Sequence, residues 1–215
     1  MNRNVKVVPA ILTDSASELT RMVVLANGFA PWVQIDMMDG LFVPSRSITT
    51  DDLGPLEFVF SWEAHLMVVD PLRYLVPLRD AGAARVIFHA ESDDDAYDVV
   101  ERCRSLGMGV GVAVNPPTTV SEIEPLLSAI DSVLLMAVYP GYYGAPFVPG
   151  VLSKIGEVRA ACPDVEIGMD GGIKESNLVE VARYGLDKVC VGSAIFGQPD
   201  PAASYRRLAA LAHGA

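Results

Sequence analysis

Two aspartates and a histidine, Asp36, His65 and Asp170, each stand near the end of an apolar segment with the character of a β-strand. Successive strand side chains point to opposite faces, so Gln34 and Asp36 share one face. Two carboxylates that face each other across a substrate can exchange protons with a carbon, one as base and one as acid. A lone aspartate is more often a polar core residue or a helix cap. Three converging groups favour a functional site, because buried unpaired charges are costly.

Glycine-rich turns follow the last two strand-like segments of the chain, at residues 165–169 and 188–191. Glycine lets the backbone approach an anion closely, and barrel folds often bind phosphate at these two turns. Either turn alone reads as an ordinary tight turn. The pair predicts a phosphate site at Gly171, Gly172, Gly192 and Ser193.

A loop at residues 140–145 and three methionines complete the expected pocket. Gly141 and Gly144 lie near the two ends of the loop, and we assign both to substrate binding. The loop suits a mobile lid and a rigid connector equally well. Methionine is usually core filler, but Met38, Met67 and Met136 near strand ends are expected to form an apolar ceiling over the reacting centre.

Two further polar residues receive lesser roles. Asp39 stands in a Met-Asp-Gly turn, and we assign it to turn structure. His89 ends a strand beside Glu91 and is expected to support the site without acting as a ligand.

The fold prediction rests on alternating short apolar runs and longer amphipathic runs. Strands are expected at 5–9, 32–36, 62–67, 85–89, 109–114, 132–138, 165–169 and 188–191. Helices are expected at 15–27, 71–81, 93–106, 120–129, 150–162, 174–184 and 201–212, with a short one around 51–58. Parallel strands need crossover helices, so the pattern predicts an α/β fold, a compact (β/α)₈ barrel. The rival, a doubly wound open sheet, usually has fewer strands, and no Gly-x-Gly-x-x-Gly motif follows the first strand.

The length and composition limit the class of protein that the chain can be. The 215 residues suit one barrel domain, 1–215, and an apolar fraction of 51% is enough for a large core. A net charge of −11 argues against nucleic-acid binding, and no apolar run reaches the length of a membrane span. Three cysteines without metal-site spacing read as reduced thiols, which predicts a cytoplasmic protein. We expect no nucleotide cofactor and a homo-oligomer.

Many segments in order resemble the ribulose-phosphate 3-epimerase family, a (β/α)₈ barrel of the ribulose-phosphate-binding type. The matching segments include Pro9-Ala10-Ile11-Leu12, Ile35-Asp36-Met37-Met38-Asp39-Gly40, His65-Leu66-Met67, Phe88-His89-Ala90-Glu91, Asp170-Gly171-Gly172-Ile173 and Gly192-Ser193-Ala194-Ile195-Phe196. The resemblance implies an isomerase that interconverts ribulose 5-phosphate and xylulose 5-phosphate through an enediolate. It implies that Asp36 and Asp170 are the acid/base pair and that they bind a divalent metal together with two histidines, one of them His65.

The chain departs from the family pattern inside the pocket itself. Gln34 stands where the family has a metal-binding histidine, and Ala10 stands where it has serine. The loop from Tyr139 to Ala145 is bulkier than the family's and lacks its amide. Imidazole is the better ligand for zinc or iron-type metals, so Gln34 as a ligand predicts a weaker zinc, iron or manganese site.

Three functions stay open at this point: the standard epimerase, a related enzyme for another sugar phosphate, and a non-catalytic phosphosugar-binding protein. The bulky Tyr139, Tyr142 and Tyr143 favour the second over a standard lid. Asp36 and Asp170 argue against the third, because binding alone does not require two opposed carboxylates. Without a metal, one carboxyl of this pair is expected to hold a proton at neutral pH.

Overall fold

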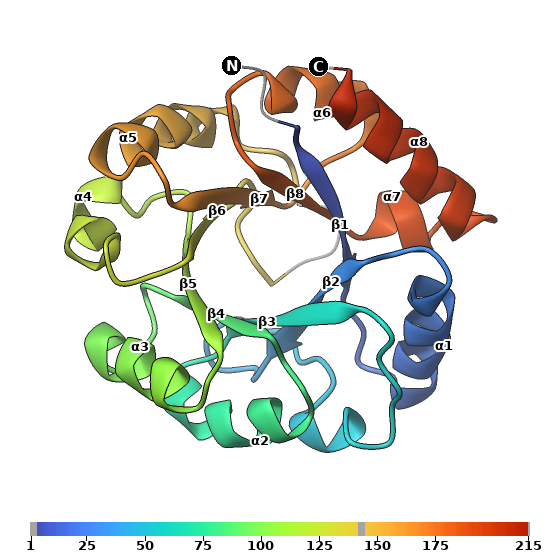
Figure 1. Ribbon diagram of the computed structural model, residues 1–215, viewed down its shortest axis with the longest axis horizontal. Coiled ribbons are helices and arrows are strands. Elements are labelled where there is room, and N and C mark those ends of the chain that lie inside the picture. The colour runs from blue at the N-terminus through green and yellow to red at the C-terminus, as the bar shows by residue number, and fades with distance from the viewer. Residues whose placement is uncertain (1–3, 142–144, 215) are drawn as a thin grey trace.

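Eight parallel strands close into a barrel in the part of the chain that the structure describes, and helices surround it (Figure 1). The structure is a computed structural model that describes residues 4–141 and 145–214. Each strand pairs with its neighbour in sequence, and β8 closes the ring against β1. The predicted (β/α)₈ barrel is therefore confirmed.

The strands match the predicted segments closely. They are β1 (Lys6–Ile11), β2 (Trp32–Met38), β3 (Ser61–Met67), β4 (Arg85–His89), β5 (Gly109–Val114), β6 (Ser132–Met136), β7 (Glu166–Asp170) and β8 (Lys188–Val191). The helices are α1 (Ala16–Asn27), α2 (Leu75–Asp80), α3 (Ala96–Ser105), α4 (Val120–Ile123), α5 (Ser153–Ala161), α6 (Glu175–Ala182), α7 (Ser193–Phe196) and α8 (Pro201–His213).

Several helices differ from the prediction. The segment expected at 120–129 divides into α4 and a 3₁₀ turn at Glu124–Leu126, because Pro125 has no N–H to continue the α-helical hydrogen bonds. The short helix expected around 51–58 is only a 3₁₀ turn at Thr50–Asp52. The single-turn helix α7, directly behind β8, was not predicted.

Strand alternation divides the core into two layers. On β2, Val33, Ile35 and Met37 belong to the large hydrophobic cluster between the barrel and its helices. The intervening residues, Gln34 and Asp36, are buried on the other face, inside the barrel. The same alternation on β3, β7 and β8 turns the polar residues inward. The fold thus collects the chain's reactive side chains in its interior.

Charged residues also occupy the barrel interior at the opposite, N-terminal end of the strands. The Lys188 ammonium lies 2.5 and 2.7 Å from the two carboxylate oxygens of Glu63, and both side chains are buried. Arg85 pairs with Glu166 at 2.5 Å and approaches Glu63 at 3.4 Å. The two positive and two negative charges of this cluster compensate one another inside the barrel.

Candidate active site

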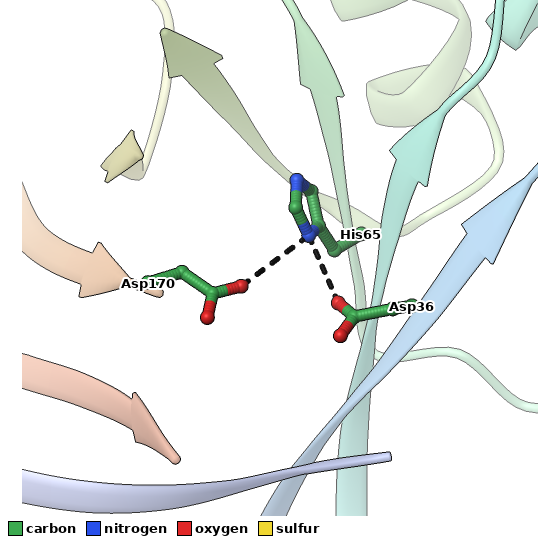
Figure 2. A group of neighbouring side chains, drawn as sticks. All are labelled: Asp36, His65 and Asp170. Atoms are coloured by element: carbon green, nitrogen blue, oxygen red, sulfur yellow. Dashed lines mark hydrogen bonds and ion pairs between the residues drawn. The ribbon is translucent and has the colours of Figure 1, made fainter. Parts of the chain in front are cut away.

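Asp36, His65 and Asp170 meet inside the barrel, as the sequence predicts (Figure 2). Asp36 lies two residues before the end of β2 and pairs in register with His65 of β3, while Asp170 is the last residue of β7. The His65 Nδ1 atom lies 2.9 Å from Asp36 Oδ1 and 3.6 Å from Asp170 Oδ2. Figure 2 shows the two carboxylates approaching the imidazole from either side.

Gln34 joins the two carboxylates. Its amide nitrogen donates to Asp36 Oδ1 at 2.8 Å and to Asp170 Oδ2 at 2.7 Å. The thiol of Cys190, on β8, donates to the Gln34 amide oxygen at 3.0 Å. Burial raises the pKa of the Cys190 thiol well above its usual range, so the thiol keeps the proton that it donates. Gln34 therefore presents N–H groups to the carboxylates, and its oxygen is directed away from them.

The pKa values of Asp170 and His65 are both shifted upward. Burial, followed by the negative charge of Asp36, raises the pKa of Asp170 to about 7. Burial opposes the charged form of His65, but its hydrogen bond to Asp36 and the charges of both aspartates raise its pKa overall. Near neutral pH this arrangement can hold a proton on Asp170 and another on His65, which is what proton transfer requires.

A cavity of about 350 Å³ opens above the two carboxylates. The sequence-predicted residues that line it are Asp36, Asp170, Met38, Met67, Met136, Gly141, Gly171, Gly172, Gly192 and Ser193. Gln34 and His65 are fully buried beside the carboxylates and contact them from inside the barrel. Gly144, Tyr142 and Tyr143 lie outside the described residues.

The glycine turn after β7 has a backbone conformation that other residues rarely adopt. Gly171 has a φ of 103° and Gly172 a φ of 67°, both in the left-handed region. A Cβ atom on Gly171 would lie 2.5 Å from the Val138 side chain, and one on Gly172 would lie 3.2 Å from Phe147. The turn therefore needs glycine at both positions to keep its shape and leave its side of the cavity open.

Asp39 has the turn role that the sequence indicates. Its carboxylate accepts the backbone N–H groups of Leu41 and Phe42, and its other oxygen accepts the N–H of Val69 at 2.8 Å. Burial disfavours its ionised form, but these hydrogen bonds lower the pKa of Asp39 overall. Asp39 thus fixes the loop that follows β2.

A second buried histidine lies behind His65. The Nε2 atoms of His65 and His89 are 3.0 Å apart, and His89 Nδ1 lies 3.1 Å from Glu91 Oε2. Burial lowers the pKa of His89 to about 4, although Glu91 opposes the shift, so His89 is neutral. Burial raises the pKa of Glu91, but its hydrogen bonds from His89, Thr118 and Asn115 lower it overall. The expected supporting role of His89 thus has a structural basis.

Sequence reasoning missed two residues of the site. Lys174, two residues after Gly172, also lines the cavity and is the basic residue next to the glycine turn. Cys190 was treated only as a reduced thiol. The two-residue period of β8 turns Cys190 to the same inward face as Lys188, and this period is the signal that could have placed it inside the barrel.

The donor set fits a divalent cation in part. Asp36, His65 and Asp170 each offer one ligand atom, and these atoms all lie within 4.8 Å of one another. Carboxylate oxygens and imidazole suit zinc, iron and manganese. Gln34 offers N–H instead of oxygen at this point, because Cys190 holds the amide oxygen. Asp36, His65 and Asp170 therefore suit a metal ion, whereas Gln34 does not in the orientation observed.

Comparisons with known proteins agree on one family. The model of the "Ribulose-phosphate 3 epimerase family" matches residues 6–196. A ribulose-phosphate 3-epimerase of Mycobacterium bovis is 35% identical over 208 residues, which cover 94% of this chain and 90% of that protein. One from Aquifex aeolicus is 38% identical over 191 residues, covering 86% of each chain.

Solved structures support the fold independently. A Mycobacterium tuberculosis tryptophan synthase structure superposes with a TM-score of 0.74 at 19% identity, covering 99% of this chain and 93% of that chain. At this identity the similarity concerns the barrel alone. Within the described residues, no helix has the length and apolar character needed to cross a membrane.

Proposed function

Because this chain belongs to the ribulose-phosphate 3-epimerase family, we propose that it interconverts D-ribulose 5-phosphate and D-xylulose 5-phosphate by inverting C3. The observation that carries the proposal is the pair of carboxylates, Asp36 and Asp170, which border one cavity at the C-terminal mouth of the barrel. A binding protein would need no such pair.

The proposed reaction moves two protons. Asp36 removes the C3 proton, and the electron pair of the broken C–H bond moves toward the C2 carbonyl to give an enediolate. Asp170, which holds a proton near neutral pH, delivers it to the opposite face of C3. The electron pair returns from the C2 oxygen to C3 as the new C–H bond forms, and the C2 carbonyl is restored. Asp36 then holds the proton taken from C3 and Asp170 has lost its own, so exchange with solvent restores the starting state.

Charge on the enediolate oxygens requires a positive or proton-donating partner. The His65 imidazole is the nearest such group, because its Nδ1 atom faces both carboxylates. A divalent cation held by Asp36, His65 and Asp170 would supply further positive charge at the same place.

The substrate's phosphate is proposed to bind at the glycine side of the cavity. Backbone N–H groups of Gly171, Gly172, Gly192 and Ser193 are the proposed donors, with Lys174 as the cationic side chain nearby. The cavity volume of about 350 Å³ lies within the range typical of small-molecule sites.

Solvent exchange tests this function directly. Ribulose 5-phosphate is incubated with the protein in D₂O, with and without added divalent metal, and C3 is followed by ¹H NMR while calorimetry measures binding. We expect deuterium at C3 and formation of xylulose 5-phosphate. Binding without exchange under both conditions would make the chain a phosphosugar-binding protein. Exchange into another ketose phosphate, but not into ribulose 5-phosphate, would reassign the substrate.

A further inference from the structure

A row of polar groups continues from the catalytic pair to the segment that follows β4, and only its last member, Glu91, is partly exposed. It runs from Asp36 through His65 and His89 to Glu91, with contacts of 2.9, 3.0 and 3.1 Å. The two imidazole rings are fully buried, with their centroids 5.1 Å apart and their planes inclined by 27°. Among the described residues, neither His89 nor Glu91 lines the substrate cavity. Their position suggests a role exerted through His65.

The hydrogen-bond directions in this row can be assigned from its outer end. Glu91 Oε1 accepts the backbone N–H of Asn115 at 2.8 Å and the hydroxyl of Thr118. Both contacts suit an ionised carboxylate, which can only accept hydrogen bonds. Glu91 Oε2 therefore accepts from His89, and the His89 proton lies on Nδ1.

The proton on His89 Nδ1 determines where the proton of His65 lies. A neutral imidazole protonated on Nδ1 has a lone pair on Nε2. His89 Nε2 therefore accepts, and the Nε2 atom of His65, 3.0 Å away, must carry the donating proton. The Nδ1 atom of His65 is then left for the side that faces Asp36 and Asp170.

We propose that His89 and Glu91 are positioning residues that hold a proton on Nε2 of His65 and so reserve Nδ1 for the reaction site. The proposal rests on the proposed epimerase function and deepens it. With its lone pair, Nδ1 can bind a cation; with a proton, it can donate to Asp36. In both states Nε2 keeps its proton and its hydrogen bond to His89. The ring therefore stays in one orientation, with Nδ1 facing the carboxylates.

Nitrogen NMR of the histidines tests the protonation pattern without substrate. The chain has three histidines, His65, His89 and His213, and the exposed His213 serves as an internal reference. Long-range ¹H–¹⁵N correlation spectra of the unmodified protein should show His89 protonated on Nδ1 and His65 protonated on Nε2. A spectrum in which His65 Nε2 carries no proton overturns the proposal, whatever the variants do.

Glu91→Gln is the matched perturbation, because it keeps the side-chain shape and removes the charge that orients His89. Its control is Glu101→Gln, the same change at an exposed position of α3. We expect Glu91→Gln to change the ring signals of His65 and His89, and to lower both kcat and zinc affinity about 10- to 100-fold. KM should stay unchanged, since Glu91 does not line the cavity, and Glu91→Asp should recover part of both losses.

Two outcomes separate this proposal from the epimerase proposal. If Glu91→Gln and Glu101→Gln have the same histidine ring signals and the same zinc affinity, the positioning role is refuted. The expected NMR pattern and loss of zinc affinity, in a protein that never exchanges the C3 proton, support the positioning role and refute the epimerase. Thermal unfolding monitored by circular dichroism identifies any variant that loses its fold, in which case the spectrum of the unmodified protein decides.

Discussion

Replacing Gln34 with histidine should tighten zinc binding, and the structure gives the size of the effect. The Gln34 amide nitrogen donates to Asp36 and Asp170 at 2.8 and 2.7 Å. A cation bound by these carboxylates would compete for the same oxygen lone pairs. Cation binding must therefore cost at least one of the two hydrogen bonds, or turn the amide against its contact with Cys190.

A hydrogen bond to a charged group contributes about 1.5–3 kcal/mol. Because about 1.4 kcal/mol is a factor of ten, losing one such bond weakens cation binding about 10- to 100-fold. Histidine at position 34 removes this competition and can supply a ring nitrogen as a further ligand. We therefore expect Gln34→His to bind zinc at least 10- to 100-fold more tightly than the unmodified chain.

Competition with a chromogenic chelator measures the zinc affinity, and elemental analysis measures the zinc content as isolated. Gln198→His is the control, because it makes the same change at an exposed residue. Equal zinc affinity in Gln34→His and the unmodified chain would refute the reasoning. One tightly bound zinc per unmodified chain would refute it as well, since Gln34 would then not impair the site.

Three further predictions concern chemistry, binding and stability. Asp36→Asn and Asp170→Asn should each lower C3 proton exchange about 10²- to 10⁴-fold, while calorimetry still detects ketose-phosphate binding; undiminished exchange would refute their roles. Gly172→Val should nearly abolish phosphate binding, because the φ of 67° at Gly172 and the nearby Phe147 side chain exclude a branched residue. Ser193→Ala should weaken phosphate binding only modestly. A larger loss in Ser193→Ala than in Gly172→Val would refute binding by backbone N–H groups. Lys188→Met should lower the free energy of unfolding in urea by about 3–5 kcal/mol, because it leaves the buried Glu63 carboxylate with only the longer 3.4 Å contact to Arg85, and an unchanged stability would refute this reasoning.

The barrel could be predicted because its strands have a local signature. A strand buried on both faces reads as a short apolar run, and β4, β5 and β8 coincide with their predicted ranges. Helices were less predictable where proline interrupts them. Pro125 divides the segment after β5, although the apolar spacing there continues as if one helix ran through it.

The site could be predicted residue by residue, but its hydrogen-bond directions could not. The two-residue period of β2 places Gln34 beside Asp36, and the barrel brings Asp170 to both. Which end of the amide faces the carboxylates depends on Cys190, a residue of β8 at the other end of the chain. No pattern along the sequence contains that contact, because it forms only when β8 closes the barrel.

The orientation of Gln34 determines what the substitution means for the chemistry. An amide oxygen directed at the carboxylates would add a weak metal ligand and leave two anions in mutual repulsion. An amide nitrogen instead donates to both carboxylates, and this contact opposes the rise in the pKa of Asp170 that burial and the Asp36 charge produce. The result is a pKa of about 7, at which one carboxyl of the pair can serve as acid while the other serves as base. Gln34 thus competes with a cation for the two carboxylates, and by limiting the rise in the Asp170 pKa it keeps that pKa near neutrality. The same acid and base remain available to the proposed epimerase with or without a bound cation.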